Sequence, residues 1–172
     1  MVHRRTASLL AVLGLLAVAS VVAGAAVDAP PTATFTNEAG TTYRVTAFAV
    51  ADTREASLTN VRVTDLDGER RPTTVGELRW PARYRSVELA DDGLDARRIR
   101  VAPGEETTVT VGTWEPGDVT VFLVEELRGN ETVARARIES CPQRQQEHGL
   151  TFETGGGSGY STCASSLDWL PS

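Results

Sequence analysis

Few residues in this chain could support catalysis. His148 is the only histidine after the first 27 residues, and its polar surroundings, PQRQQEH, predict a solvated loop. A Ser-His-Asp mechanism would have to use this ring, since histidine is the usual proton shuttle. The sequence has no G-x-S-x-G nucleophile motif, and its GGGSG segment lacks the context of a phosphate-binding loop. We therefore expect no catalytic residues and no cofactor.

Cys141 and Cys163 are the only two cysteines, and an even pair in an exported chain first indicates a disulfide. Closing a loop of about 23 residues contributes roughly 3.4 kcal/mol by the chain-entropy relation, and the bond requires α-carbons within about 7 Å. Two alternatives stay open. One is a metal site that adds His148 and Asp168, although the C-x₂₋₄-C spacing of zinc sites is missing. The other is a pair of free or intermolecular thiols.

Three further motifs are candidates for binding or modification. The turn Asp91-Asp92-Gly93-Leu94-Asp95 gathers three carboxylates, but it does not have the spacing of a calcium loop, and we interpret it as an acidic exposed turn. Trp80 and Tyr84 lie among arginines and could form a ligand or sugar-stacking platform, or could cap the core beneath the arginine stems. Asn130 begins the glycosylation sequon Asn-Glu-Thr in an expected hairpin turn.

Composition excludes several classes of protein. The 172 residues include 17 arginines and no lysine against 23 acidic residues, a net charge of −6. Without lysine there is no Schiff-base chemistry, and without a methionine beyond Met1 there is no methionine ligand to copper or haem. The acidic pI near 5.0 disfavours nucleic acid as a partner. Basicity from arginine alone, with excess acid, resembles proteins of salt-loving archaea.

The N-terminal segment predicts export. Residues 1–8 contain Arg4 and Arg5 and no acid, and residues 9–27 contain no charge. A small-x-small pattern ending at Ala25 marks a cleavage site for a signal peptidase. The apolar run is also close to the roughly 20 residues that span a bilayer, so a retained membrane anchor competes with a cleaved signal, and a buried core helix is a third interpretation. Both leading interpretations place residues 28–172 at the cell surface or outside the cell, in contact with the membrane only through the N-terminal segment.

After this segment the chain is expected to form strands. A linker, 28–33, precedes a domain, 34–165, and a tail, 166–172, follows it. Short runs of alternating or apolar residues, separated by Asp-Gly and Pro-Gly turns, predict an all-β antiparallel sandwich. No window has a sustained helical period, although a short helix near 93–100 stays open. The expected strands are 42–50, 58–66, 75–80, 84–89, 99–101, 107–111, 119–127, 132–140, 150–154 and 160–164.

The stretch RIRVAPGEETTVTVGTWEPGDVTVFLVEE resembles immunoglobulin-like surface modules of archaea and bacteria, of the kind related to cell adhesion. In both, an apolar strand meets the turn Pro103-Gly104-Glu105, and a Thr/Val strand and a Gly117 turn then lead into a long apolar strand. The resemblance implies an immunoglobulin-like fold and a non-catalytic role in the cell envelope, structural, adhesive or binding, with an envelope protein or a glycan as partner. The alternative is a secreted hydrolase or metal-binding enzyme whose site lies among surface carboxylates.

Overall fold

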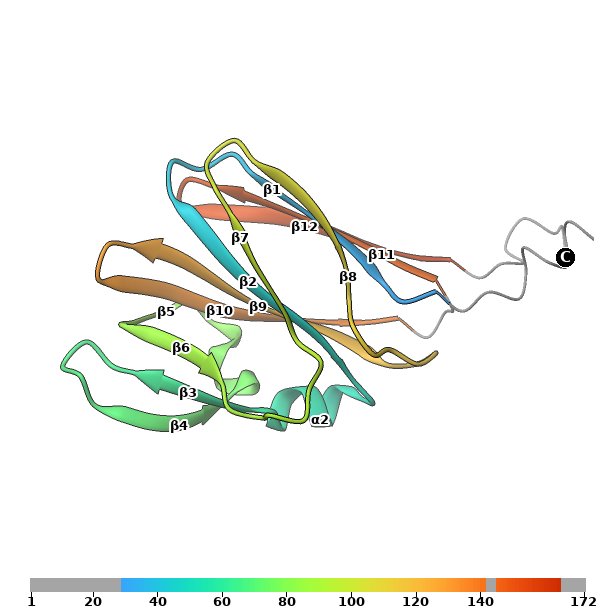
Figure 1. Cartoon of the computed structure of the whole chain (residues 1–172), viewed down its shortest axis with the longest axis horizontal. Coiled ribbons are helices and arrows are strands. Elements are labelled where there is room, and N and C mark those ends of the chain that lie inside the picture. The colour runs from blue at the N-terminus through green and yellow to red at the C-terminus, as the bar shows by residue number, and fades with distance from the viewer. Residues whose placement is uncertain (1–28, 142–144, 165–172) are drawn as a thin grey trace, which may run out of the picture.

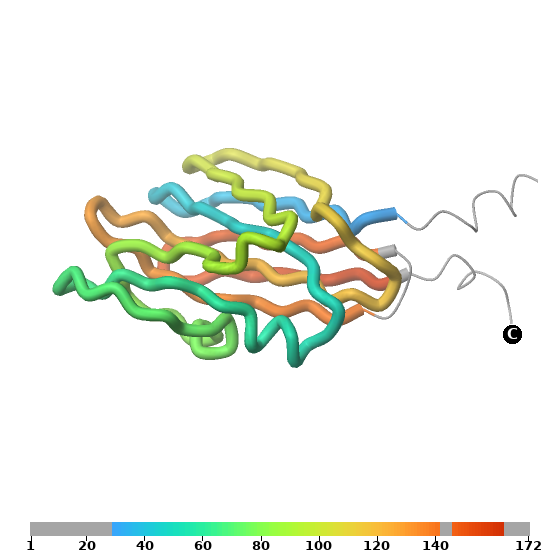
Figure 2. Tube along the Cα trace, turned by 60° about the horizontal axis from the view of Figure 1, so that its bottom comes forward, coloured from blue at the N-terminus to red at the C-terminus, as the bar shows by residue number. Residues whose placement is uncertain are grey.

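The computed structural model describes residues 29–141 and 145–164, which form three stacked β-sheets (Figure 1). The expected signal or anchor segment, with Ala25, and the tail 166–172 lie outside these residues. Within the described part, no helix has the length and apolar character needed to cross a membrane. Most strands run along the long axis of the molecule (Figure 2).

Each sheet has its own strand order. The four-stranded sheet consists of β12 (Gly156–Ala164), β11 (Gln145–Glu153), β1 (Thr32–Asn37) and β8 (Glu106–Thr110). The five-stranded sheet in the middle consists of β5 (Ala82–Tyr84), β10 (Glu131–Ser140), β9 (Val119–Arg128), β2 (Thr42–Val50) and β7 (Arg97–Val101). The three-stranded sheet consists of β4 (Arg70–Thr74), β3 (Asn60–Thr64) and β6 (Ser86–Leu89).

The five-stranded sheet is buried on both faces, and this explains its sequence. Along β9, Val121 and Leu123 pack into a core shared with the three-stranded sheet. Phe122 and Val124 point the other way, into a core shared with the four-stranded sheet. A strand covered on both sides needs apolar residues at successive positions rather than at alternate ones. The all-β sandwich predicted from the sequence therefore has three layers.

Aromatic rings fill the core between the four-stranded and five-stranded sheets. Phe35 of β1 meets Phe122 of β9 edge to face, with ring centroids 5.8 Å apart. Tyr43 of β2 stacks on Phe152 of β11 at 4.3 Å. Such pairs stabilise a core beyond the area that they bury. These contacts fix β1 and β11 over the middle sheet.

Two short helices cover one end of the other core and correct the strand prediction. The helix α2 (Thr53–Leu58) begins at Asp52, whose side chain accepts a hydrogen bond from the Glu55 amide at 2.7 Å. The 3₁₀ helix η1 (Val75–Arg79) replaces the strand expected at 75–80. Val75 and Leu78, three residues apart, share its buried face, and this spacing suits a 3₁₀ helix but not a strand.

The four-stranded sheet departs from expectation in three ways. β1 begins at Thr32, inside the segment expected to be a linker, and it pairs with β11 in parallel, so the sheet is mixed rather than antiparallel. More than 100 residues separate these two strands, which leaves ample chain for a parallel connection. The glycine-rich segment 155–159, expected to be a loop, belongs to β12 from Gly156 onward, and the hairpin turn is confined to residues 154–155. A short helix near 93–100 was an alternative in the sequence analysis, but residues 97–101 form the strand β7.

Candidate functional site

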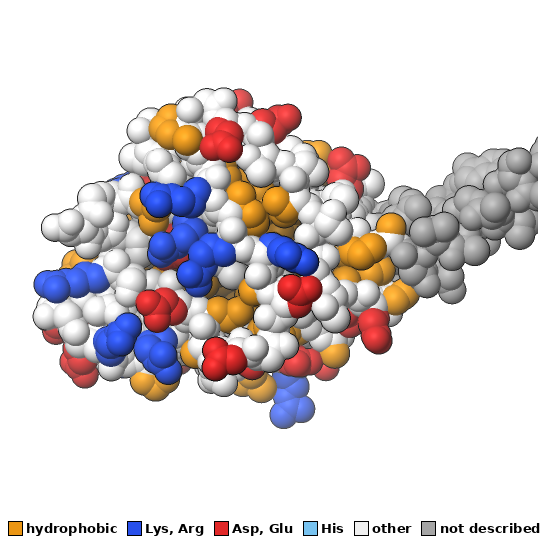
Figure 3. Space-filling view, viewed as in Figure 1, with side chains coloured by type: hydrophobic (Ala, Val, Ile, Leu, Met, Phe, Trp, Pro, Cys, Tyr) orange, Lys and Arg blue, Asp and Glu red, His pale blue; other side chains and the backbone are white. Residues whose placement is uncertain are grey.

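Arginine side chains gather in the middle of one face, near β2 and β7, although the chain as a whole is acidic (Figure 3). Arg44, the arginine of β2, forms a two-point ion pair with Glu125 of β9, at 2.6 and 2.5 Å. Glu125 is only 1% exposed. The hydrogen bond that Arg44 donates to this carboxylate raises the pKa of Arg44, against the opposing effect of burial.

Cys141 and Cys163 form the expected disulfide, with their α-carbons 5.9 Å apart. The bond joins the residue after β10 to β12, the edge strand of the four-stranded sheet. Because both sulfurs are oxidised, neither is a thiolate that could bind zinc as the alternative interpretation required. Asp168 lies outside the described residues. Within the described ranges, no cluster of three His, Cys, Asp or Glu side chains could hold a metal ion.

His148 does not lie in a solvated loop, as the sequence predicted, but is fully buried in β11. Its Nδ1 lies 3.0 Å from the hydroxyl of Ser161, and its Nε2 lies 3.3 Å from Oε1 of Gln146. Ser161 in turn donates to Glu139 at 2.7 Å. The ring also meets Phe122 edge to face. Burial lowers the pKa of His148, while Glu139 opposes this effect and Arg137 adds to it.

A serine beside a histidine raises the question of nucleophilic catalysis, and the geometry opposes it. The hydroxyl of Ser161 donates to the carboxylate of Glu139, and a negative charge at that distance disfavours the alkoxide that an attack would need. The imidazole is buried between the sheets rather than facing a cleft. Gln146, on the far side of the ring, donates its amide to the carbonyl of Cys141 at 2.9 Å. The arrangement ties β10, β11 and β12 together, as a structural network does.

The expected aromatic platform is divided between surface and core. Trp80 is 82% exposed, whereas Tyr84 is 7% exposed and belongs to the core beneath β5. In the short β5 strand, side chains alternate between the faces of the sheet, and Tyr84 points inward. The two rings therefore do not form one ligand-facing surface, and Trp80 alone is available for contact.

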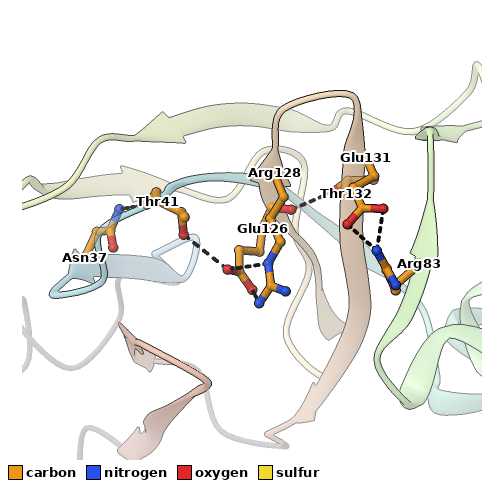
Figure 4. Close-up of polar contacts among 7 residues, drawn as sticks. All are labelled: Asn37, Thr41, Arg83, Glu126, Arg128, Glu131 and Thr132. Atoms are coloured by element: carbon orange, nitrogen blue, oxygen red, sulfur yellow. Dashed lines mark hydrogen bonds and ion pairs between the residues drawn. The ribbon is translucent and has the colours of Figure 1, made fainter.

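A cluster of polar side chains surrounds the end of the β9–β10 hairpin (Figure 4). Arg128 binds Glu126 through two hydrogen bonds, at 2.8 and 2.9 Å. Thr41 donates to the same carboxylate at 3.2 Å, and Thr132 donates to the backbone carbonyl of Glu126 at 3.1 Å. Asn37, which is fully buried, stabilises the connection between β1 and β2 by donating to the carbonyl of Thr41 at 2.9 Å.

On the other side of this hairpin, Arg83 of β5 binds both oxygens of Glu131, at 2.6 and 2.7 Å (Figure 4). Asn130, the sequon asparagine, is exposed at the tip. A small cavity of about 130 Å³ opens nearby, lined by Tyr43, Pro81, Val124, Glu126, Arg128, Val133, Arg135, Gly155 and Gly156. The charged groups beside it are already paired with each other, apart from Arg135, so the cavity holds no convergent set of catalytic groups.

Four surface carboxylates near α2 and the acidic turn form local hydrogen bonds. In an open depression beside α2, Asp52 caps the helix and Glu55 accepts from the amide of Ala51 at 3.3 Å. Asp91 accepts from the amide of Gly93, and Asp95 accepts from the hydroxyl of Thr113 at 3.1 Å. The depression joins α2 to the acidic turn, and its carboxylates hold the backbone of both segments.

A family model described as "Halobacterial Ig domain protein" matches residues 1–172, the whole chain. The chain belongs to this halobacterial Ig domain family. The resemblance to immunoglobulin-like modules of archaea that the turns and strands suggested is thereby confirmed. As a member of this family, the protein is an immunoglobulin-like module.

Other comparisons add little to the family assignment. No curated protein matches this Ig domain protein in sequence. Among solved structures, it is similar to the human-specific toxin intermedilysin (9% identity, TM-score 0.35), to pneumolysin (6%, 0.34) and to the cytotoxin suilysin from Streptococcus suis (6%, 0.27). The matches cover 77–78% of this chain but only 23% of each toxin. Likenesses this weak carry no argument about function.

Sequence reasoning missed three features of this Ig domain protein: an ion pair, a network around His148 and the helix α2. The ion pair of Arg44 and Glu125 joins residues 81 apart in the chain, and no local pattern identifies it. The network around His148 was missed because β11 was expected to begin at Leu150, which left His148 outside the sheet. The helix α2 did carry a recognisable signal, since Asp52 and Glu55 have the spacing of a helix-capping pair.

Proposed function

We propose that this chain is exported and that residues 28–172 act as a non-catalytic immunoglobulin-like module of the cell envelope, in a structural, adhesive or binding role. The disulfide between Cys141 and Cys163 carries the proposal, because disulfides persist in oxidising compartments and are rare in reducing cytosol. The uncharged run 9–27, preceded by Arg4 and Arg5, supplies a route out of the cell.

Fractionation of cells with N-terminal sequencing and thiol alkylation tests export. We expect the protein in the membrane or outside the cell with both thiols blocked. A new N-terminus just after Ala25 would identify a cleaved signal, whereas an intact chain in the membrane would identify an anchor. Full-length soluble protein in the cytosol, with two alkylated cysteines, would contradict the proposal.

The non-catalytic role rests on the geometry around His148. A buried ring between a carboxylate-bound serine and a glutamine stabilises strands and has no open face for a substrate. We expect His148→Ala to weaken folding and to leave envelope function intact at temperatures where the variant stays folded. Loss of a reproducible enzymatic activity in a folded His148→Ala protein would overturn this part of the proposal.

Two exposed features suit a surface protein. Trp80 presents an apolar ring that can contact an envelope protein or stack on a sugar. Asn130 is accessible, but Thr132, the third residue of its sequon, is 2% exposed and bonded to the backbone. Glycosylation would therefore have to occur before β10 pairs with β9. Mass spectrometry of the exported protein, with Asn130→Gln as the reference, tests occupancy.

A further inference from the structure

The β7 strand forms one free edge of the five-stranded sheet and has the sequence RRIRV. Its register with β2 places Arg98 opposite Thr46 and Arg100 opposite Arg44. Ile99 packs against the core shared with the four-stranded sheet. Since side chains alternate along a strand, Arg98 and Arg100 lie together on the opposite face, about 7 Å apart.

Both of these arginines are exposed, and within the described residues neither forms an ion pair or a side-chain hydrogen bond. Their neighbours differ, because Arg44 is held by Glu125 and Arg97 lies 3.7 Å from Asp95. Like charges directly opposite each other in a ladder are unfavourable, as Arg44 and Arg100 are here. In a chain with more acidic than basic residues, these two arginines leave a local positive charge, and no described carboxylate forms an ion pair with either of them.

The edge strands of the five-stranded and three-stranded sheets are protected in different ways. β4 contains Pro72, and β5 and β6 have only three and four residues. β7 has five residues and no proline, and its arginines repel an identical strand from a second copy of the protein. The same charge attracts a strand that carries carboxylates at matching positions, so it selects a partner rather than closing the edge.

We propose that β7 is a docking edge for an extended segment of a partner protein that carries Asp or Glu at alternate positions. The segment adds a sixth strand to the five-stranded sheet. Two of its carboxylates lie beside Arg98 and Arg100, and the residue between them lies beside Ile99 on the other face. Main-chain hydrogen bonds supply the affinity, and the two guanidinium–carboxylate pairs supply the register. This inference goes beyond the proposed function, since it does not depend on where the protein is located.

A peptide fits these observations better than an acidic glycan does. The regularly spaced main-chain N–H and C=O groups of an edge strand are matched in register by another extended main chain, whereas a glycan has no such series of donors and acceptors. Alternate side chains of an added strand recur at the spacing of Arg98 and Arg100. Ladder hydrogen bonds also depend less on salt than charge pairs alone, which ions screen within about 3 Å at 1 M.

Titration of the disulfide-bonded protein with synthetic peptides tests the proposal. The probe is TVEVEVT, and the comparison peptide TVEEVVT has the same composition but places its two carboxylates on opposite faces. Binding is measured by fluorescence anisotropy of labelled peptide and by shifts of the β7 amide signals in NMR. We expect saturable binding of TVEVEVT, at least tenfold weaker binding of TVEEVVT, and signal changes concentrated in β7.

Charge reversal supplies the matched control. We expect the double variant Arg98→Glu/Arg100→Glu to bind TVEVEVT at least tenfold more weakly than the natural protein does, and to bind TVKVKVT instead. Arg62→Glu, which reverses an exposed, unpaired arginine of the three-stranded sheet, should leave binding unchanged. Circular dichroism confirms that each variant is folded. Equal binding of both acidic peptides, unchanged binding by the double variant, no saturable binding, or equally tight binding of a galacturonate oligosaccharide would overturn the proposal. Export, tested by fractionation, could still hold in each of these cases.

Discussion

At the scale of single residues, the buried charged and polar side chains are those whose substitution should change the stability of the fold most. Glu125 and His148 are both almost completely inaccessible to solvent, and the cost of burying each group is offset in a different way. Glu125 is paired with Arg44, which donates a hydrogen bond to each of its two carboxylate oxygens. His148 is favoured in its neutral form, because burial lowers its pKa. The two sites therefore respond differently to substitution and to pH.

We expect Arg44→Met to lower the free energy of unfolding by about 3 kcal/mol, since it leaves the buried Glu125 carboxylate without its partner. The double variant Arg44→Met/Glu125→Leu should recover most of that loss, because it removes the unpaired charge as well. Urea unfolding of the single and double variants measures both values. Equal destabilisation in the two proteins would show that packing, rather than charge, explains the effect.

Acid should weaken the fold through His148. Because its pKa is lowered in the folded state, the unfolded chain binds the proton first as the pH falls below about 6.5. The free energy of unfolding should then decrease by up to about 1.4 kcal/mol per pH unit between the unfolded and the folded pKa. Denaturant titrations between pH 5 and pH 7 measure this slope, and His148→Gln should lack it. An unchanged slope in that variant would assign the effect to other groups.

At the scale of elements, the strand β12 depends on its glycines and on the disulfide. Its glycines lie over arginines of β10: a side chain at Gly157 would come within 2.6 Å of the carbonyl oxygen of Thr151 and 3.0 Å of Arg135. Tyr160 covers Gly149 on the neighbouring strand. With little apolar surface of its own, the strand is held by its register with β11 and by the disulfide.

The matched pair Gly157→Val and Gly156→Val tests this account of β12. Gly156 has nothing within 4 Å of the position of an added side chain. We expect Gly157→Val to destabilise the protein by about 1–3 kcal/mol and Gly156→Val to change its stability by less than about 0.5 kcal/mol. Thermal unfolding of the two variants compares them directly. Equal stability would mean that the backbone of β12 moves to accommodate a side chain.

Replacing both Cys141 and Cys163 with serine should lower the free energy of unfolding by about 3 kcal/mol, because the unfolded chain gains the entropy of an open loop. Denaturation of the variant, compared with the natural protein with and without reductant, measures the loss. The reduced natural protein should resemble the variant. If reductant leaves the stability of the natural protein unchanged, the bond does not form in solution.

At the scale of the whole molecule, the middle sheet is the structural centre. Hydrogen exchange should be slowest for the amides of Val121, Phe122 and Leu123, because β9 lies inside its sheet and is covered on both faces. The edge strand β12 should exchange much faster. Exchange measured by NMR gives both rates, and faster exchange in β9 than in β12 would contradict a fold with this sheet at its centre.

The sequence by itself determined most of the strands and turns. The long apolar run at 119–127 and the alternation at 132–140 predicted an all-β fold, because these signals lie in neighbouring residues. The two cysteines indicated a disulfide, with a metal site or free thiols as alternatives, and the immunoglobulin-like type came from a family resemblance around the turn Pro103-Gly104-Glu105. The two helices were harder to predict from the sequence. The helix α2 has only six residues, and the residues of η1 also suit a short strand.

Only the tertiary structure decided which faces are covered and which residues meet. The third layer, the parallel pairing of β1 with β11, the burial of His148 and the pairing of Arg44 with Glu125 join segments that are distant in sequence. Local preference carries no information about such contacts, since they depend on how the sheets stack. For the same reason Trp80 and Tyr84, four residues apart, lie on the surface and in the core. Only the register with β2 and the position of β7 at a sheet edge show that Arg98 and Arg100 are available to a partner.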